Sequence, residues 1–403
     1  MWKRGDLRLL LVGLVFILAW AGIGYRLFEL QGPRAVALAS VGFDQRIREE
    51  PIDARRGTIY DREGIELAMT IDGWNVVVDP TMLDDPAQAA AVLAPFSDAS
   101  WEELTDAFVT GQQDGRRYAE VAMRVDTEAK DAIASVVDEH DIVGVFYRAQ
   151  PLRVYPAGHI AAQVVGLTRH DDGAGIEGLE KTFDSELQGE PGRLIVERDP
   201  SGRVIPQGQV LLEPATVGSD LITTIDREVQ FAAEQGLRRA VQQTNAKGGS
   251  VVAVDPKTGA ILAMASYPGL DLNERSEITP EVLRNRAVAD VYEPGSTLKA
   301  VTVAAAIEEG IVTSDTPIDT PKSVVVGDFE YEDHGTNPPW MSVADVVQRS
   351  SNVGTIEIQR RLGNDLHYDY LTAFGLGSPS GLDVAGERHG QLNPTSQWTE
   401  TSG

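Results

Sequence analysis

Ser296 and Lys299 are the two residues whose types and spacing most directly suggest chemistry. We predict a helix from Ser296 or Thr297 to about Glu309, which places both side chains on one face because residues three apart are helix neighbours. The first turn offers free N–H groups and the positive end of the helix dipole to a developing anion. A lysine whose pKa is lowered by burial or a nearby cation can serve as the base that a serine nucleophile needs. Alone, SxxK arises by chance about one time in three in such a chain, and then marks only an N-cap serine and a surface lysine.

A second polar group, Ser350 and Asn352, stands in the sequence Arg-Ser-Ser-Asn-Val-Gly. It lies between two helical patterns, Val343–Gln348 and Thr355–Leu362. A tight junction of this kind presents a hydroxyl that can relay a proton and an amide that can hold a peptide backbone. A helix–turn–helix with polar turn residues is the better explanation of this motif when it stands alone.

The composition limits the function classes open to these residues. The chain has 403 residues, 42% hydrophobic and 24% charged, which allows two or three globular domains and excludes a disordered or polytopic membrane protein. Its 35 basic and 61 acidic residues give a net charge of −26, so no nucleic-acid binding is expected. Cysteine is absent and the six histidines show no ligand-like spacing, so we predict neither a cofactor nor a metal.

The N-terminal segment is apolar enough to enter a membrane. No charge interrupts residues 9–25, and a helix of this length only just spans a hydrocarbon core of about 30 Å. Lys3, Arg4 and Arg8 precede it and favour a cytoplasmic N-terminus. A cleaved signal peptide is the alternative, because Ala-Trp-Ala at 19–21 fits a cleavage site, and a buried soluble helix is a third reading. Either of the first two leaves the rest of the chain outside the cytoplasm.

Periodicity and turn residues predict the elements that must position the two motifs. The expected helices are those mostly filling Asp79–Gly144, one over Gly178–Leu187 and one from about Arg227 to Gln243. The expected strands are a short one after Gly64, Asp220–Thr224, and a hairpin of Ser250–Val254 and Ala260–Ala265. The polar stretch Asp199–Gly218 contains glycine and proline and is typical of a linker between domains.

Together, the two motifs form the pair that occurs in β-lactamases and penicillin-binding proteins. The sequence resembles class B penicillin-binding proteins, the monofunctional peptidoglycan D,D-transpeptidases, and most closely their septal, cell-division type. The resemblance covers nearly the whole chain. The segments that show the resemblance are RRGTIYDREGIELA, GIEGLEKTFDSELQGEPG, SVVAVDPKTGAILAMASYP, NRAVADVYEPGSTLK, VVQRSSNVG and FGLGSPSGLDVAGERHGQLNPTSQW.

The resemblance implies one N-terminal transmembrane helix, an α+β pedestal domain and a β-lactamase-like transpeptidase domain with an antiparallel sheet packed between helices. The expected boundaries are 1–8 for a cytoplasmic tail, 9–25 for the anchor, 26–205 for a dimerisation-type pedestal, 206–218 for a linker and 219–403 for the transpeptidase domain. The protein is then expected in the bacterial cytoplasmic membrane, with its catalytic domain on the extracytoplasmic side.

The resemblance also implies roles for the four motif residues. Ser296 would attack the penultimate D-Ala carbonyl of a peptidoglycan stem peptide, and Lys299 would take its proton. Ser350 would relay that proton to the leaving group, and Asn352 would align the donor. An amine of a neighbouring stem would resolve the acyl-enzyme. The implied partners are stem peptides ending in D-Ala-D-Ala, β-lactams, a SEDS-type glycosyltransferase and other division membrane proteins.

One departure from the family pattern concerns its third motif, Lys-Thr/Ser-Gly, on a strand well after Ser-x-Asn. The chain stops at Gly403, before such a strand. Lys257-Thr258-Gly259 spells the motif but precedes the nucleophile, in the predicted hairpin turn, so we interpret it as a chance match. We therefore expect a truncated chain with an incomplete transpeptidase domain that is inactive by itself.

Two other function classes stay open at this point. A non-catalytic module that docks onto division proteins fits the missing motif, whereas a β-lactamase or carboxypeptidase needs neither anchor nor pedestal. The remaining polar residues suggest structure rather than catalysis. His334 is interpreted as a surface histidine, and Arg55, Arg56, Asp61 and Arg62 as an ion-paired turn.

Overall fold

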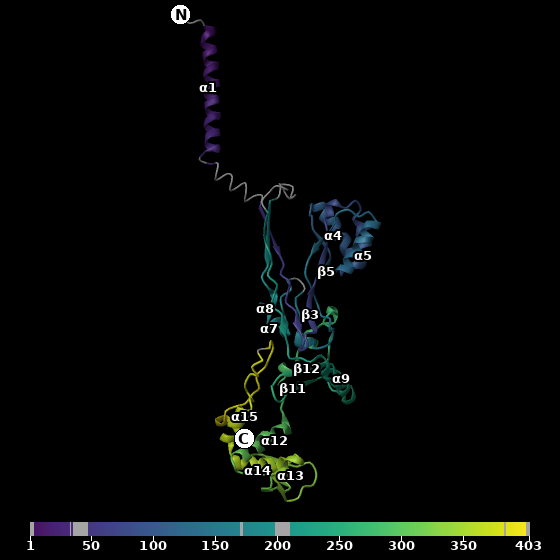
Figure 1. The fold of residues 1–403 in the computed structure, drawn as a ribbon, viewed down its shortest axis with the longest axis vertical. Coiled ribbons are helices and arrows are strands. Elements are labelled where there is room, and N and C mark those ends of the chain that lie inside the picture. Colours follow the sequence, from purple (N-terminus) through teal and green to yellow (C-terminus); the bar gives the residue numbers. More distant parts are fainter. Residues whose placement is uncertain are drawn as a thin grey trace. The chain divides into compact units, whose positions relative to one another are not determined.

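The computed structural model describes residues 4–32, 34, 47–169, 172–197, 210–382 and 384–399. The chain forms two compact units, coloured along the sequence in Figure 1. The first comprises Met1–Thr58, Thr70–Arg153 and Ser185–Asp220, and the second comprises Ile59–Met69, Val154–Asp184 and Leu221–Gly403. Each unit is therefore assembled from segments that are far apart in the sequence.

The N-terminal helix α1 runs from Arg4 to Gln31. Its stretch Leu11–Gln31 is long and apolar enough to cross a membrane, and none of it is buried by protein. The helix extends beyond both ends of the predicted anchor at 9–25. It fits the anchor and the signal-peptide alternative alike, whereas its exposure contradicts a buried soluble helix.

The first unit contains a three-stranded antiparallel sheet in the order β5–β4–β6, with helices packed against it. Its elements are β4 (Gly73–Val78), α3 (Pro86–Leu93), α4 (Trp101–Asp114), β5 (Ala119–Asp126), α5 (Thr127–Glu139) and β6 (Val145–Ala149). Phe108 and Ile133 are fully buried in its core. The prediction of mostly helix over Asp79–Gly144 is confirmed by α3, α4 and α5, with β5 as the exception, because that segment pairs with β4 and buries Val121 and Ala122.

A second sheet of the first unit combines β1 (Ile47–Ile52), β8 (Gly192–Glu197) and β9 (Val210–Glu213) in antiparallel order. Strand β9 falls inside the region 206–218 that the sequence analysis interprets as a linker. Residues 206–209 lie outside the described residues, but β9 is paired with β8, and Thr216 bridges to Glu190. The linker interpretation is therefore wrong for 210–213, whose backbone groups are satisfied by a neighbouring strand.

The second unit begins with short strands around the RRGTIYDREG segment. Strand β2 (Ile59–Tyr60) pairs in parallel with β10 (Leu221–Ile222) and antiparallel with β3 (Glu66–Ile71). The short helices α6 (Ala162–Val165) and α7 (Gly178–Thr182) follow in this unit, whereas most of β7 (Leu152–Val154) and of α8 (Asp184–Gln188) belongs to the first unit. The predicted helix over Gly178–Leu187 is thus two short helices, separated at Phe183.

Helix α9 (Arg227–Thr244) packs on the hairpin of β11 (Gly249–Val254) and β12 (Ile261–Tyr267). The Asp226 side chain caps α9 by accepting from the backbone N–H groups of its first turn, which explains why the helix begins there. Leu237 and Val241 bury their side chains against Ala265 of β12. This helix and this hairpin confirm the predicted elements closely.

The last part of the second unit is mainly helical. It contains α10 (Pro280–Leu283), α11 (Arg286–Ala289), a 3-10 turn η4 (Gly295–Leu298), α12 (Lys299–Glu308), α13 (Val343–Gln348), α14 (Asn352–Leu362) and α15 (Asn364–Ala373). Strand β13 (Pro317–Asp319) pairs antiparallel with β16 (Trp340–Ser342), and the segment between them forms a hairpin of β14 (Ser323–Val326) and β15 (Phe329–Glu332). Helix α12 contacts α13, α14 and α15, which gather together in Figure 1. Buried Val303, Val346 and Ile358 hold α12, α13 and α14 together.

Candidate active site

Ser296 and Lys299 lie where a 3-10 turn becomes an α-helix. Gly295 begins η4 with a positive φ of 60°, a conformation that glycine adopts without steric cost. Ser296 follows in η4 with an exposed side chain, and Lys299 is the first residue of α12. The predicted helix is therefore present, but its first turn is 3-10.

The Lys299 ammonium joins the two motifs. Its Nζ donates to the Ser350 carbonyl oxygen at 2.6 Å, to the Ser350 Oγ at 3.2 Å and to the Asn352 Oδ1 at 2.6 Å. Three of the four predicted site residues thus meet directly, although the two motifs are some 50 residues apart. Ser296 lies three residues before Lys299, in η4, but no hydrogen bond joins its hydroxyl to the other three among the described residues.

The Ser-Ser-Asn segment is a tight junction between α13 and α14. Ser350 adopts a left-handed φ of 54°, Ser351 caps α14 by accepting from the Gly354 N–H at 2.8 Å, and Asn352 begins that helix. The Asn352 Nδ2 donates to the Glu332 carbonyl oxygen at 3.2 Å. Ser351 is buried, whereas Ser350 is exposed and Asn352 half-buried, so the outer two residues of the triplet are the ones that face Lys299.

Asp333 is a residue of this site that sequence reasoning missed. Its carboxylate accepts from the Ser351 Oγ at 2.6 Å, from the Val353 N–H at 3.1 Å and from the Asn337 Nδ2 at 2.8 Å. The sequence analysis noticed this segment only through the neighbouring His334, which is exposed as expected. No local pattern distinguishes Asp333, because its main contacts come from residues about 20 positions away.

The electrostatics of the cluster depend on Lys299 and Asp333. Burial lowers the pKa of Lys299 from its ordinary value, and the negative charge of Asp333 opposes this shift only in part. Burial by itself would raise the pKa of Asp333, but hydrogen bonds from Ser351, Asn337 and backbone N–H groups outweigh it, so that pKa lies below its usual range. A lysine with a lowered pKa next to hydroxyl groups can accept a proton, which is the property a general base requires.

The other polar residues that the sequence brings to notice serve the fold. Arg55 pairs with Asp72 at 3.2 Å and Arg62 with Asp226 at 3.8 Å, so these arginines bind acids outside their own turn. Asp61 instead accepts from the backbone N–H groups of residues 63 and 65, both at 2.8 Å.

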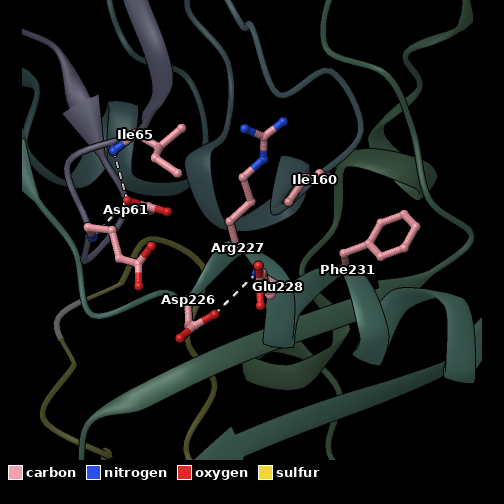
Figure 2. A pocket seen from close by; sticks show the side chains of 8 residues that line it. Asp61, Ile65, Ile160, Asp226, Arg227, Glu228 and Phe231 are labelled. Carbon is pink, nitrogen blue, oxygen red and sulfur yellow. Dashed lines mark hydrogen bonds between the residues drawn. The ribbon is translucent and has the colours of Figure 1, made fainter.

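Figure 2 shows Asp61 and Asp226 at a pocket of about 520 Å³ in the second unit. Ile65, Ile160 and Phe231 supply apolar parts of its wall, and none of the four motif residues lines it. This pocket is thus separate from the cluster around Lys299. The structural interpretation of the turn is supported by these contacts, in which Arg55 and Arg62 pair with acids outside the turn.

Two family models match this chain. The penicillin-binding protein transpeptidase domain matches residues 249–403, and the penicillin-binding protein dimerisation domain matches residues 51–223. The chain belongs to the class B penicillin-binding proteins. The predicted family, its septal type and the fold class of one apolar helix, a dimerisation domain and a transpeptidase domain are thereby confirmed.

Individual relatives support this membership. The peptidoglycan D,D-transpeptidase FtsI of Escherichia coli (strain K12) is 31% identical, over 95% of this chain and 64% of FtsI. Stage V sporulation protein D of Bacillus subtilis (strain 168) is 32% identical, over 96% of this chain and 59% of that protein. The crystal structure of penicillin binding protein 3 from Mycobacterium tuberculosis, complexed with aztreonam, has 28% identity and a TM-score of 0.61 over 88% of this chain and 59% of that one. The chain therefore spans about three fifths of the length of these relatives.

Proposed function

We infer that this penicillin-binding protein is a serine-type D,D-transpeptidase that cross-links peptidoglycan stem peptides at the division septum and is acylated by β-lactams. The observation that carries this proposal is the three-way contact of the half-buried Lys299 with Ser350 and Asn352, one helical turn after Ser296. An exposed hydroxyl at the start of a helix, with a base of lowered pKa on the next turn, is the arrangement that covalent acyl transfer requires.

In the proposed reaction, the Ser296 Oγ forms a bond to the carbonyl carbon of the penultimate D-Ala. Lys299 takes the hydroxyl proton, and Ser350 passes a proton to the amine of the terminal D-Ala as its C–N bond breaks. The Ser296 N–H is aimed at the developing oxyanion from the first turn. An acceptor amine of a neighbouring stem then displaces Ser296, and the Asn352 amide holds the donor backbone.

The membrane arrangement is part of the same proposal. Helix α1 acts as an uncleaved anchor with its N-terminus in the cytoplasm, so the domains proposed at 26–205 and 219–403 lie outside. A Cβ at Gly13, Gly22 or Gly24 would meet nothing within 4 Å apart from the helix's own backbone, which leaves room for close helix packing. A SEDS-type glycosyltransferase and division membrane proteins are the proposed partners of this face.

Covalent labelling by a fluorescent penicillin tests the proposal. A version of the protein that includes the family's third motif should form a denaturation-resistant adduct, and Ser296→Ala in that version should abolish it. Ser314→Ala is the matched control, because Ser314 is an exposed serine of the same unit, and it should label normally. Labelling of Ser296→Ala, or no labelling of the unsubstituted protein above that of Ser296→Ala, would contradict the proposal and favour the docking role instead.

A further inference from the structure

Asp333 connects three segments around the Ser-Ser-Asn turn. It lies just after β15, and its two carboxylate oxygens accept from the Ser351 hydroxyl, the Val353 N–H and the Asn337 amide. The Ser351 hydroxyl in turn accepts from the Gly354 N–H at the start of α14. This continuous chain of hydrogen bonds ties the loop after β15 to the first turn of that helix.

The hydrogen bonds of Ser351 determine which way the side chains of Ser350 and Asn352 face. Ser351 is only 1% exposed, so its side chain points into the protein. Ser350 and Asn352 then lie on the other side of the turn, where both contact the Lys299 ammonium. The left-handed φ of Ser350 needs such support, because an L-residue does not hold this conformation without neighbouring constraints.

The charge of Asp333 also reaches Lys299. No hydrogen bond joins the two residues among the described atoms, but Asp333 bonds Ser351, which stands between the two residues that Lys299 contacts, and its negative charge opposes the lowering of the Lys299 pKa by burial. The titratable side chain that α15 directs at α12 is His367, whose Nε2 bonds the Thr302 hydroxyl at 3.0 Å. Asp345 of α13 is bonded to Ser342 at the far end of its helix. Asp333 is therefore the carboxylate whose negative charge affects the pKa of Lys299.

We propose that Asp333 is the positioning residue of this site, holding the Ser-Ser-Asn turn in its reactive shape and acting through its charge on Lys299. The inference deepens the proposed function and rests on it. Both roles require a carboxylate, since Oδ2 accepts from Ser351 and Asn337 while Oδ1 accepts from the Val353 N–H, and an asparagine offers only one acceptor oxygen. The NH₂ group of an asparagine would instead face one of the N–H or O–H groups that now donate to Asp333, so that hydrogen bond would be lost.

Four variants separate the two roles. Asp333→Asn removes the charge and one acceptor, while Ser351→Ala removes the hydroxyl and keeps the charge. Asp345→Asn is the matched control, because Asp345 also accepts a 2.6 Å bond from a serine hydroxyl and caps a helix. Asp333→Glu keeps the charge and covers the case in which Asp333→Asn fails to fold.

Two measurements on the full chain do not depend on acylation. NMR titration of ¹³Cε-labelled lysine, with Lys299 assigned through Lys299→Arg among the seven lysines, gives the pKa of Lys299 directly. In Asp333→Asn that pKa should fall further, because the charge that opposes the effect of burial is gone, whereas Ser351→Ala, Asp333→Glu and Asp345→Asn should leave it nearly unchanged. Amide hydrogen exchange at Val353 and Gly354 should speed up in Asp333→Asn and Ser351→Ala, but not in Asp345→Asn.

Fluorescent-penicillin acylation then reports the consequence for the reaction. Asp333→Asn and Ser351→Ala should react about 10- to 100-fold more slowly, since small misplacements of reacting groups cost this much. An unchanged Lys299 pKa in Asp333→Asn would contradict the proposal that the charge of Asp333 acts on Lys299. Unchanged exchange and acylation would overturn the positioning role. Failure of the proposed function appears separately, as normal labelling of Ser296→Ala.

Discussion

Two turns of the second unit combine a lysine, a hydroxyl and an aspartate, and they differ in what surrounds the lysine. In the turn of the β11–β12 hairpin, Asp255 accepts from the Lys257 N–H at 2.9 Å and from the Thr258 hydroxyl at 2.8 Å. Lys257 is exposed, and its ammonium makes no hydrogen bond or ion pair within the described residues. All contacts of that turn lie within a few residues of one another.

The cluster around Lys299 uses the same residue types over a longer range. Asp333 and Ser351 come from different segments, and Lys299 is half-buried between α12 and the Ser-Ser-Asn turn. Burial lowers the pKa of this lysine, which a short exposed turn cannot do. The comparison teaches that matching residue types do not make a reactive site by themselves. The lysine must also be shielded from water by segments that are distant in the sequence.

Exchanging each lysine for arginine tests this contrast most strongly. Lys299→Arg should slow penicillin acylation at least about 10²- to 10⁴-fold, because a guanidinium does not deprotonate at working pH and cannot act as a base. Lys257→Arg should leave the rate unchanged. Stopped-time labelling of both variants, beside the unsubstituted protein, measures the two effects. Similar rates for Lys299→Arg and the unsubstituted protein would reduce Lys299 to a positioning charge.

The pH dependence of acylation sharpens the same contrast. The reactive form of Lys299 is unprotonated, so the rate should rise with pH, by about tenfold per unit below the pKa of Lys299. Because burial lowers that pKa, the rise should level off below 10.5, the ordinary pKa of an exposed lysine. The second-order rate of penicillin acylation between mildly acidic and alkaline pH provides the profile. A midpoint at 10.5, as for an exposed lysine, would contradict the effect of burial.

Substituting one glycine in each turn gives the smallest expected effects. A Cβ at Gly354 would lie 2.5 Å from the Val346 Cγ2, so Gly354→Ala should destabilise the protein by about 1–3 kcal/mol and slow acylation. Gly259 has open space but a φ of 75°, so Gly259→Ala should cost about 1 kcal/mol with acylation unchanged. Thermal melts with parallel labelling measure both. Slower acylation in Gly259→Ala would show that the hairpin turn contributes to the reaction.

The elements that the sequence predicts well are those with local determinants. Helix α9 combines an aspartate cap with an amphipathic pattern, and the β11–β12 hairpin has branched residues around a Pro/Gly turn. Strand β5 has the sequence AEVAMRVD, whose residues are mostly helix formers, and only its pairing with β4 makes it a strand. Tertiary pairing of this kind leaves no local signal.

The same distinction applies to the site. The motif spacing predicted Lys299, Ser350 and Asn352 as site residues, and their side chains lie together in the structure. It could not identify Asp333, since an aspartate in a polar loop is typical of any surface turn. Nor could it predict the left-handed φ of Ser350 or the burial of Ser351 between two exposed-facing neighbours, because both follow from the packing of α13 and α14.

The backbone of Ser350 carries a consequence for how this position evolves. A left-handed φ of 54° costs a serine about 1–2 kcal/mol, and glycine adopts it without that cost. A library at this position selected only for heat resistance should therefore enrich glycine among the residues that lack a hydroxyl. Selection for reaction with penicillin should restore serine, so selection for heat resistance and selection for reactivity should favour different residues at this position.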